Sequence, residues 1–413
     1  MQPAPALEEI DFCAEAQLDS DIQFPHPLSR HPLEPRHAFL TGATGFTGVY
    51  LLVEILNTTP ATVHCLVRAA DDGAARERVV RHLKNYGLWR DEYADRIHAV
   101  AGDLEQERLG LPHAIFRQLA EQLDVIYHGA GSVNMAFPYG RLKPANVNGT
   151  REVLRLAGTA STKPVHFLSS IAVFYSEAVS TRGFLEESDE PEYDATLKGG
   201  YSKSKWVADR LVAGARERGL PAAIYRPVRI MGHSRTGAIS DIGDNLPPLL
   251  KGCILLGKFP ALDIEVTMVP VDYVSGAMIH LSRQEKSWGR AFHFFNPAPI
   301  AWRKLMAVLQ DLGYPMDEVP LEEWMEDLRL RAVGFGNQPE EVTRLFAVLR
   351  LAMLAPHFLF YKRPVFGAEY TREGLAGSGI ACAPVDKALV STYVDFWQKT
   401  GYLEAPVAQP VQG

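Results

Sequence analysis

The feature that most constrains the fold is a regular alternation of short apolar segments with segments of helical length. Seven apolar runs have the length of buried strands, and they span residues 37–41, 62–68, 97–101, 123–128, 164–170, 222–227 and 291–296. Helix-length segments lie between them, at 49–56, 74–86, 115–122, 150–159 and 202–218. Strands that read as nearly continuous apolar runs are covered on both faces. The pattern therefore predicts an α/β fold, a Rossmann-type doubly wound parallel sheet of about seven strands.

Two stretches break the alternation and indicate a second unit. Residues 233–265 are rich in Gly, Pro and Asp and have little period, and residues 298–402 are mostly helical in pattern. We expect these two stretches to form one smaller, mostly helical C-terminal lobe. The predicted organisation is an N-terminal linker segment at 1–36, a Rossmann domain at 37–232 that continues at 266–297, the lobe at 233–265 and 298–402, and a tail at 403–413.

The composition excludes several classes of protein. The chain has 413 residues, of which 47% are hydrophobic and 22% charged, as in ordinary globular proteins. Its formal net charge of −7 argues against a nucleic-acid binder that depends on a basic surface. The four cysteines, Cys13, Cys65, Cys253 and Cys382, have the spacing of neither a metal site nor a disulfide framework. Because no signal peptide and no apolar run of about 18 residues is visible, we expect a soluble, cytoplasmic protein without a membrane span.

A glycine-rich segment follows the first predicted strand and opens a helix. It reads Thr41-Gly42-Ala43-Thr44-Gly45-Phe46-Thr47-Gly48. Its three glycines allow a tight turn, a close backbone approach to a pyrophosphate and close packing of the helix on the strand, and the helix N-terminus adds free N–H groups. The segment predicts a dinucleotide site made by Gly42, Thr44, Gly45, Phe46, Thr47 and Gly48. A tight turn with a purely structural role is the alternative.

The end of the second predicted strand indicates which dinucleotide binds. A site selective for NAD usually carries an acidic residue there, which binds the 2′-hydroxyl of the adenine ribose. This chain has Arg68 at that place and no acidic residue before Asp71. A guanidinium can bind two oxygens of a 2′-phosphate, and Arg78 on the following helix could close over the same phosphate. We therefore predict NADP, as NADPH, for the cofactor. The alternative is that both arginines are solvated surface residues.

Further strand ends supply candidate cofactor contacts. Asp103 and Leu104 follow the third strand, where the carboxylate can accept from the adenine amino group and the leucine can pack on the ring. Gly129 and Ala130 follow the fourth strand, where small residues let the cofactor lie against the backbone. Pro227, at the end of the sixth strand, completes the predicted cofactor set.

The most informative segment is Tyr201-Ser202-Lys203-Ser204-Lys205. Tyr201 and Lys205 are four residues apart, so they share one face of a helix. A phenol has a pKa of about 10, and we expect the neighbouring ammonium to lower it toward neutrality. Lys205 can also bind the nicotinamide ribose, and Ser170, at the end of the fifth strand, can donate to a substrate carbonyl. We predict Ser170, Tyr201 and Lys205 as the catalytic residues, with Tyr201 and Lys205 also at the cofactor. The alternative for the pair is an ordinary amphipathic helix face.

Together these motifs resemble the extended short-chain dehydrogenase/reductases. Within that superfamily the chain is similar to the thioester reductase domains, or R domains, that terminate nonribosomal peptide and polyketide assembly lines. Aminoadipate reductases and carboxylic acid reductases have related domains. Besides the glycine loop and Tyr-x-x-x-Lys, the likeness extends to residues 13–19, 66–68, 86–89, 146–150, 225–232, 379–384 and 400–403. The family's catalytic hydroxyl, often threonine, falls on Ser170, and serine lacks the methyl group that restrains the threonine rotamer.

The resemblance implies reductive release of a bound acyl chain. An acyl or peptidyl chain arrives as a thioester on the phosphopantetheine arm of a carrier protein, is reduced at the expense of NADPH, and leaves as an aldehyde; a second round would give the alcohol. It further implies a monomer or a part of a larger synthetase. Two alternatives stay open: a nucleotide-sugar epimerase or dehydratase of the same superfamily, and a non-catalytic protein that senses the dinucleotide.

Two expectations concern the smaller lobe. We expect Arg235 and Lys251 at a surface that receives the carrier protein. Seven apolar residues near the C-terminus form either ordinary core or a site that retains a lipophilic acyl chain between two rounds of reduction: Phe346, Leu349, Leu351, Met353, Leu354, Phe358 and Phe360. Retention of the aldehyde would then decide whether the alcohol forms.

Overall fold

A computed structural model of the chain describes residues 10–240, 246–334 and 364–406. Its centre is a parallel sheet of seven strands in the order β12-β7-β5-β4-β1-β2-β3. The strands are β1 (His37–Thr41), β2 (Thr62–Val67), β3 (Ile97–Ala101), β4 (Val125–His128), β5 (Val165–Leu168), β7 (Ala222–Pro227) and β12 (Ala291–Phe294). Each falls on a predicted strand, so the doubly wound Rossmann-type fold is confirmed.

The direction of winding reverses next to the first strand. The chain runs outward from β1 through β2 to β3, and then returns to the other side of β1 and runs through β4, β5 and β7 to β12. Thr41, the last residue of β1, pairs with Leu66 on one side and with His128 on the other. The carboxyl ends of these strands therefore meet at one edge, where such sheets bind their ligands.

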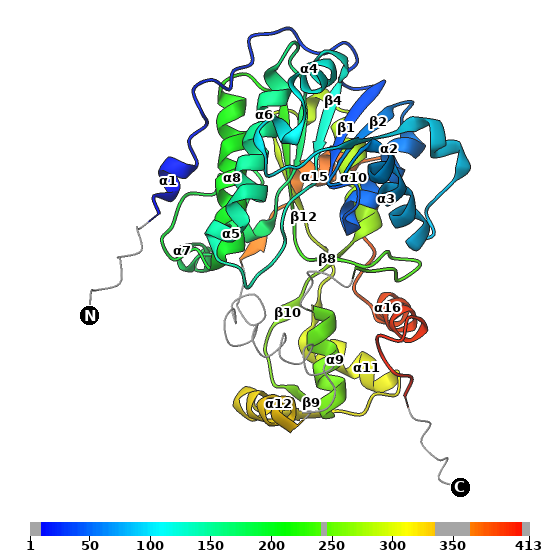
Figure 1. Cartoon of the computed structure of the whole chain (residues 1–413). Helices are drawn as coiled ribbons and strands as arrows, with labels where there is room; N and C mark the ends of the chain where they lie inside the picture. The colour runs from blue at the N-terminus through cyan, green and yellow to red at the C-terminus, as the bar shows by residue number, and fades with distance from the viewer. Residues whose placement is uncertain (1–9, 241–245, 335–363, 407–413) are drawn as a thin grey trace, which may run out of the picture.

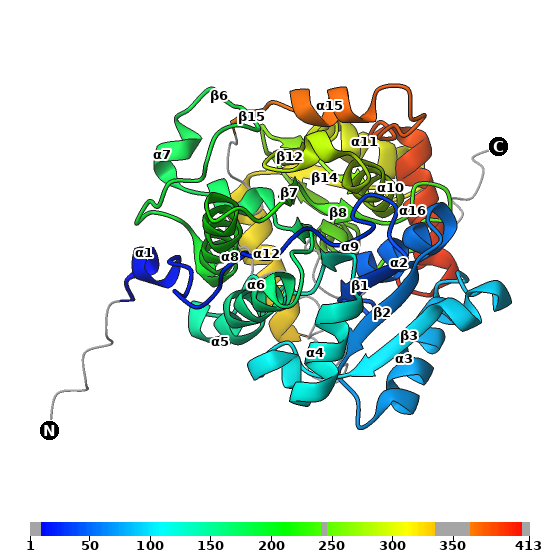
Figure 2. The same ribbon diagram turned by 90° about the horizontal axis from the view of Figure 1, so that it is seen from above.

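Helices cover both faces of the sheet (Figure 1), and the view from above in Figure 2 shows the two layers on either side of it. The helices on one face are α2 (Phe46–Thr58), α3 (Asp72–Asn85) and α10 (Val271–Ser282). Those on the other face are α4 (His113–Gln122), α6 (Gly149–Gly158) and α8 (Gly199–Glu217), with α5 (Tyr139–Lys143) and the π-helical turn η3 (Pro144–Asn148) beside them. Because both faces are covered, every residue of β4, β5, β7 and β12 is buried.

A smaller lobe lies below the sheet in Figure 1 and has its own apolar core. Its elements are α9 (Leu246–Leu256), β9 (Lys258–Pro260), β10 (Glu265–Val266), β13 (Ile300–Ala301), α11 (Trp302–Asp311), β14 (Asp317–Val319), α12 (Leu321–Gly334) and α16 (Lys387–Lys399). Trp302 and Trp324 are fully buried in this core. The helix α9 lies in a stretch where the sequence showed little period. Its prolines, Pro247 and Pro248, occupy the first turn, where proline is tolerated.

Short elements join the two parts or border the sheet. The pairs β8 (Ile230–Met231) with β11 (Val269–Pro270), and β6 (Phe184–Leu185) with β15 (Val365–Phe366), are both parallel. The remaining helical elements are α1 (Phe12–Glu15), α7 (Glu177–Ser180), α15 (Glu369–Leu375), η1 (Asp91–Arg96), η2 (Glu107–Gly110), η4 (Ile171–Phe174) and η5 (Glu285–Ser287). No helix in the described ranges is both long enough and apolar enough to cross a lipid bilayer.

The segment from residue 10 to 36, which the sequence suggested as a linker, packs along α5, α6 and α8. Leu18 and Ile22 are buried in the main core. Arg218, just after α8, donates to the carbonyl oxygens of Leu18, Asp19 and Ile22 at 2.6–2.8 Å. These bonds satisfy backbone groups that a loose linker would leave to water. The described part of this segment is therefore bound to the fold.

Candidate functional site

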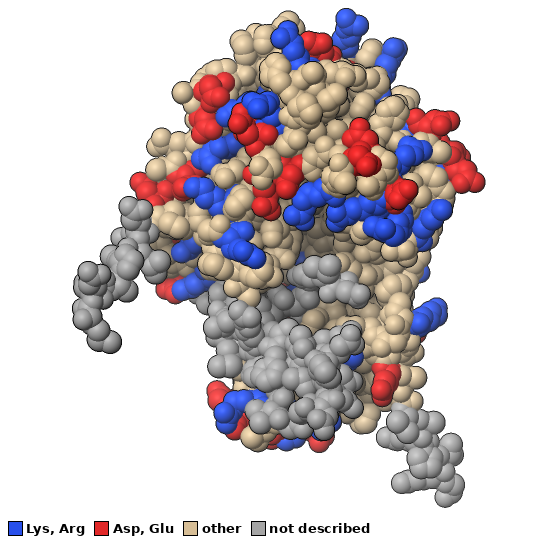
Figure 3. Space-filling view, viewed as in Figure 1, with Lys and Arg blue, Asp and Glu red and all other residues tan. Residues whose placement is uncertain are grey.

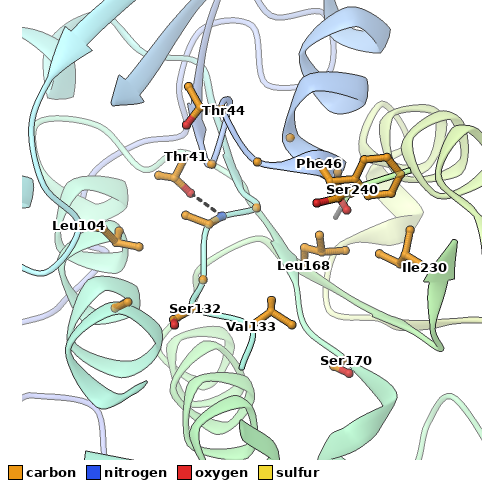
Figure 4. Close-up of a pocket in the computed structure, with 18 of the residues that line it drawn as sticks. Thr41, Thr44, Phe46, Leu104, Ser132, Val133, Leu168, Ser170, Ile230 and Ser240 are labelled. Atoms are coloured by element: carbon orange, nitrogen blue, oxygen red, sulfur yellow. Dashed lines mark hydrogen bonds between the residues drawn. The ribbon is translucent and has the colours of Figure 1, made fainter. Parts of the chain in front are cut away.

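A cavity of about 660 Å³ opens at the carboxyl edge of the sheet. It is lined by all the residues that the sequence put forward for cofactor binding and catalysis: Gly42, Thr44, Gly45, Phe46, Thr47, Gly48, Arg68, Arg78, Asp103, Leu104, Gly129, Ala130, Ser170, Tyr201, Lys205 and Pro227. Figure 4 shows side chains converging on it from opposite sides, with Leu104 on one side, Ile230 on the other and Ser170 below. The fold thus brings together residues that lie up to 185 positions apart (Gly42 to Pro227).

The glycine loop is shaped so that a ligand can approach its backbone. Gly42 has a positive φ of 85°, and a Cβ there would lie 2.9 Å from the Ala130 nitrogen. A Cβ on Gly48 would lie 1.8 Å from the Gly42 oxygen, so the packing of α2 on β1 requires glycine. Gly45 precedes α2 and offers no side chain to cap it. The first N–H groups of α2 are left for an anion, which fits the pyrophosphate of a dinucleotide.

One end of the cavity carries exposed charge. Figure 3 shows Lys and Arg side chains in a row beside a hollow in this face, and Arg68 and Arg78 line the cavity. The Arg68 side chain is 66% exposed, and its guanidinium lies 4.0 Å from the Glu105 carboxylate. Arg78 donates to the Arg68 carbonyl oxygen at 2.8 Å, which fixes the backbone at the end of β2. An exposed guanidinium at this place fits a 2′-phosphate.

Two residues at this end were missed by sequence reasoning. Glu105 belongs to the loop after β3, so no local signal placed its carboxylate beside Arg68. His82 of α3 also lines the cavity, and burial together with Arg78 and Arg81 lowers the pKa of its imidazole. Asp71 is the nearest acidic residue after Arg68 in the sequence, and it has a structural role. Its carboxylate caps α3 by accepting from the Ala74 nitrogen at 2.8 Å.

The third strand end holds its two candidates in different ways. One carboxylate oxygen of Asp103 accepts from the Glu105 nitrogen at 3.0 Å, so the side chain stabilises its own loop. Leu104 lies against α6, where a Cβ on Gly149 would meet it at 2.4 Å. Both residues still line the cavity, and their contacts with adenine remain a prediction.

The other end of the cavity is buried and belongs to α8. Tyr201 and Lys205 are only 6% and 5% exposed. The Lys205 ammonium donates to the Leu168 carbonyl oxygen at 2.8 Å and lies 4.9 Å from the centre of the Phe167 ring. Burial lowers the pKa of Lys205 to about 8, although the nearby Asp209 carboxylate acts in the opposite direction. Tyr201 and Lys205 thus lie one helical turn apart on α8 and both line the cavity, as the spacing predicted.

The expected lowering of the Tyr201 pKa is wrong for this structure. Burial raises the pKa of Tyr201 to about 12, and a hydrogen bond with Ser170 opposes that rise. The half-buried Tyr175, which also lines the cavity, raises it further. Loss of water around the phenol outweighs any benefit from the ammonium, because desolvation penalises the charged form most strongly in a closed site. Tyr201 is thus held protonated, as a donor.

A buried ion pair supports this end from behind. The carboxylate of Asp209, two turns after Tyr201 on α8, accepts from the Arg226 Nε at 3.1 Å and from its Nη2 at 2.9 Å. The Ser169 hydroxyl donates to the same carboxylate at 2.6 Å. Burial works against ionisation, but Arg226 holds the pKa of Asp209 below its ordinary value. The pair ties α8 to the ends of β5 and β7, and sequence reasoning did not find it.

The remaining wall of the cavity is largely apolar. Val133, Met135, Ile171, Ala172, Ile230 and Ile239 line it. Tyr175 packs against the core of the sheet and also against the core of the smaller lobe. Within the described ranges, no group of three or more His, Cys, Asp or Glu residues could hold a metal ion. This end of the cavity therefore combines hydroxyl donors with an apolar surface.

Comparison with known proteins identifies the family. A model of the Male sterility protein family matches residues 40–278. The solved terminal R domain from the myxalamid PKS-NRPS biosynthetic pathway has a TM-score of 0.90 and 36% identity, with 96% of this chain and 99% of that chain covered. The chain belongs to the Male sterility protein family, in its branch of terminal reductase domains. This membership makes it an oxidoreductase with a nicotinamide-dinucleotide site, and it favours the reductase interpretation over the epimerase alternative.

Curated relatives of this terminal reductase domain are much longer proteins. It is 38% identical over 389 residues to one component of the linear gramicidin synthase of Brevibacillus parabrevis, covering 94% of this chain and 8% of that protein. It is 34% identical over 401 residues to the L-2-aminoadipate reductase large subunit of Eremothecium gossypii, covering 90% of this chain and 28% of that protein. The chain therefore spans less than a third of either relative.

Proposed function

We propose that the chain releases a carrier-bound acyl or peptidyl thioester as an aldehyde, with NADPH as the reductant. The observation that carries this proposal is the convergence of Ser170, Tyr201 and Lys205 on the cavity that also holds the glycine loop. Membership in the terminal reductase branch supports it. So do the names of the relatives, which include a gramicidin synthase.

Residues along the cavity would hold the cofactor. The backbone of the glycine loop and the start of α2 would bind the pyrophosphate, Arg68 the 2′-phosphate, and Lys205 the nicotinamide ribose. Gly129, Ala130 and Pro227 would lie along its length. When bound, NADPH supplies the hydride that the reduction needs.

The hydroxyl donors act on the substrate carbonyl. The Ser170 and Tyr201 hydroxyls donate to the thioester oxygen and stabilise the negative charge that develops as the carbonyl carbon becomes tetrahedral. Tyr201 then transfers its proton to that oxygen, which gives a hemithioacetal, and Lys205 stabilises the phenolate that remains. Loss of the carrier thiol breaks the C–S bond and leaves an aldehyde.

The smaller lobe is proposed to bind the acyl chain and to face the carrier protein. Arg235 is exposed, as a docking residue must be. Lys251 is unsuited to that role, because its ammonium donates to the Tyr402 carbonyl oxygen at 2.7 Å and so joins α9 to the chain after α16. The apolar cluster from Phe346 to Phe360 lies outside the described residues, so the further reduction to an alcohol stays a prediction.

A cytoplasmic location completes the proposal. All four cysteines are unpaired, which is the usual state in a reducing compartment.

The deciding experiment incubates the protein with NADPH and a series of acyl-pantetheine thioesters, with products read by mass spectrometry. We expect NADPH oxidation only when a thioester is present, with release of free thiol and one aldehyde per NADPH. Two NADPH per thioester with an alcohol product would show the second reduction. A purified protein that holds NAD tightly and oxidises no NADPH with any thioester would contradict the proposal and favour an epimerase.

A further inference from the structure

A chain of buried hydrogen bonds runs behind the cavity, with a histidine at its centre. His128 is the last residue of β4 and is 1% exposed. Its Nδ1 lies 2.8 Å from the Thr41 hydroxyl on β1, and its Nε2 lies 3.0 Å from the Thr150 hydroxyl on α6. One imidazole ring therefore joins β4, β1 and α6.

The neighbouring bonds fix the direction of every proton in this chain. The Thr150 hydroxyl donates its proton to the Asn146 carbonyl oxygen at 2.7 Å, so it must accept from His128 Nε2–H. Burial, together with Lys205, lowers the pKa of His128 to about 3, and the ring is neutral. Its Nδ1 then carries the lone pair and accepts the proton of the Thr41 hydroxyl.

The two ends of the chain reach different parts of the site. At one end the Thr41 oxygen accepts from the Ala130 nitrogen at 3.1 Å, the bond drawn in Figure 4, and Ala130 lies against Gly42 in the glycine loop. At the other end the Asn146 amide donates to the Ser204 hydroxyl at 2.9 Å, and Ser204 donates to the Tyr201 carbonyl oxygen at 2.8 Å. The chain thus runs from the cofactor loop to the backbone of the helix that carries Tyr201.

We propose that His128 is a positioning residue that sets the distance between the bound cofactor and the Tyr201 hydroxyl. A shift of the glycine loop or of α8 would leave a buried hydroxyl or ring nitrogen without its partner, which costs more than the bond itself contributes. His128 is not among the residues that line the cavity, and it acts through Thr41 and, by way of Thr150, through Asn146. The expected effect of His128 on turnover rests on the proposed function. Its expected effect on cofactor binding can be measured without any substrate.

Two conservative variants each remove the hydrogen bond on one side of His128 and keep the bond on the other side. In His128→Asn the amide oxygen takes the place of Nδ1 and keeps the acceptor for Thr41, but nothing reaches Thr150. In His128→Gln the amide nitrogen takes the place of Nε2 and keeps the donor to Thr150, but Thr41 loses its acceptor. His128→Leu loses both bonds. The readouts are the NADPH dissociation constant, from fluorescence titration without thioester, and kcat with a saturating pantetheine thioester.

We expect a different loss for each variant. His128→Asn keeps NADPH affinity and lowers kcat about tenfold, His128→Gln weakens NADPH binding about tenfold and keeps more of kcat, and His128→Leu shows both losses. The matched control is His166→Asn. His166 is fully buried in the neighbouring strand and pairs with Tyr127, so it faces the opposite side of the sheet from His128. We expect this control to lower the melting temperature and to leave both readouts unchanged.

Equal losses in the Asn and Gln variants would overturn the inference, as would variants that match His166→Asn and lose only thermal stability. Failure of the proposed function is recognised separately. If the unaltered protein reduces no thioester, the titration with NADPH alone still tests the hydrogen bonds between His128 and the glycine loop. If His128→Gln then binds NADPH as tightly as His128→Asn does, the role of His128 at the glycine loop is refuted.

Discussion

The two ends of the cavity are built in opposite ways. At the Arg68 end the charged groups are largely in water, with the Arg68 and Glu105 side chains 66% and 42% exposed. At the Tyr201 end the polar groups are buried, and Tyr201 and Lys205 are only 6% and 5% exposed. Exposed charges are screened and can exchange partners at little cost, whereas buried ones are held by fixed partners and have shifted pKa values. The open end is suited to a ligand that comes and goes, and the closed end to proton transfer.

The closed end is also the better supported one. Asp209 and Arg226 are fully buried and bind each other through two hydrogen bonds, and Ser169 donates to the same carboxylate. At the open end Arg68 has one carboxylate at 4.0 Å. Loss of this buried support should therefore affect folding, changes at Tyr201 and Lys205 should affect turnover, and changes at the open end should affect cofactor binding.

The largest effect is expected for Tyr201→Phe. Removal of the hydroxyl takes away the proton donor and should lower kcat by about 10²- to 10⁴-fold, while NADPH affinity stays nearly unchanged. Steady-state kinetics with a pantetheine thioester, together with NADPH titration, measures both. A variant that keeps most of its kcat would remove Tyr201 from the mechanism.

Asp209→Asn tests the support behind the closed end. The change removes the buried carboxylate that faces Arg226, leaves its charge to the more distant, 48% exposed Glu190 carboxylate at 3.8 Å, and should lower the free energy of unfolding by about 3 kcal/mol. Denaturant unfolding measures the loss. The control is Glu121→Gln, because the Arg117–Glu121 pair on α4 is exposed and should contribute less than about 1 kcal/mol. Similar values for the two variants would show that the buried pair supports nothing.

Arg68→Ala tests the open end. Loss of a charge-assisted contact with the 2′-phosphate should weaken NADPH binding by about 1.5–3 kcal/mol and hardly change NADH binding. Glu105→Gln should act in the opposite direction and strengthen NADPH binding slightly, since the carboxylate competes for Arg68 and repels the phosphate. Titration with both cofactors decides. An equal loss for NADPH and NADH would make Arg68 a structural residue.

The smallest expected effect is a dependence on pH. As the pH rises, kcat should fall while the stability does not, and this difference separates chemistry from folding. Because burial lowers the pKa of Lys205 to about 8, its ammonium form disappears above that pH, and kcat should fall up to about tenfold per unit. Between about 8 and the ordinary value of 10.5 the unfolded chain binds more protons at this lysine, so its contribution to stability rises with pH. Activity loss with no loss of stability is the expected result. If the fall in kcat still occurs near pH 8 in Lys205→Arg, the group that titrates there is not Lys205.

Several features could be predicted from sequence because they are local. The seven strands, the turn at Gly42, and the placement of Tyr201 and Lys205 on one helix face depend on residues close together in the chain. Parallel strands then bring their carboxyl ends to one edge, so the sequence alone predicts Arg68, Asp103 and Gly129 at one site, and all three line the cavity. Helix α9 was harder to predict, since 11 residues with two prolines give little period.

Only the tertiary structure decided the electrostatics of the site. The sequence by itself determined the sheet, the glycine loop and the hydroxyl, tyrosine and lysine set, because strand and helix periods fix which residues reach the sheet edge. It did not determine the pairing of Asp209 with Arg226, the approach of Glu105 to Arg68, or the raised pKa of Tyr201. These depend on which distant groups meet and on how much water remains around them. Desolvation is a property of the packed molecule, and no spacing along the chain encodes it.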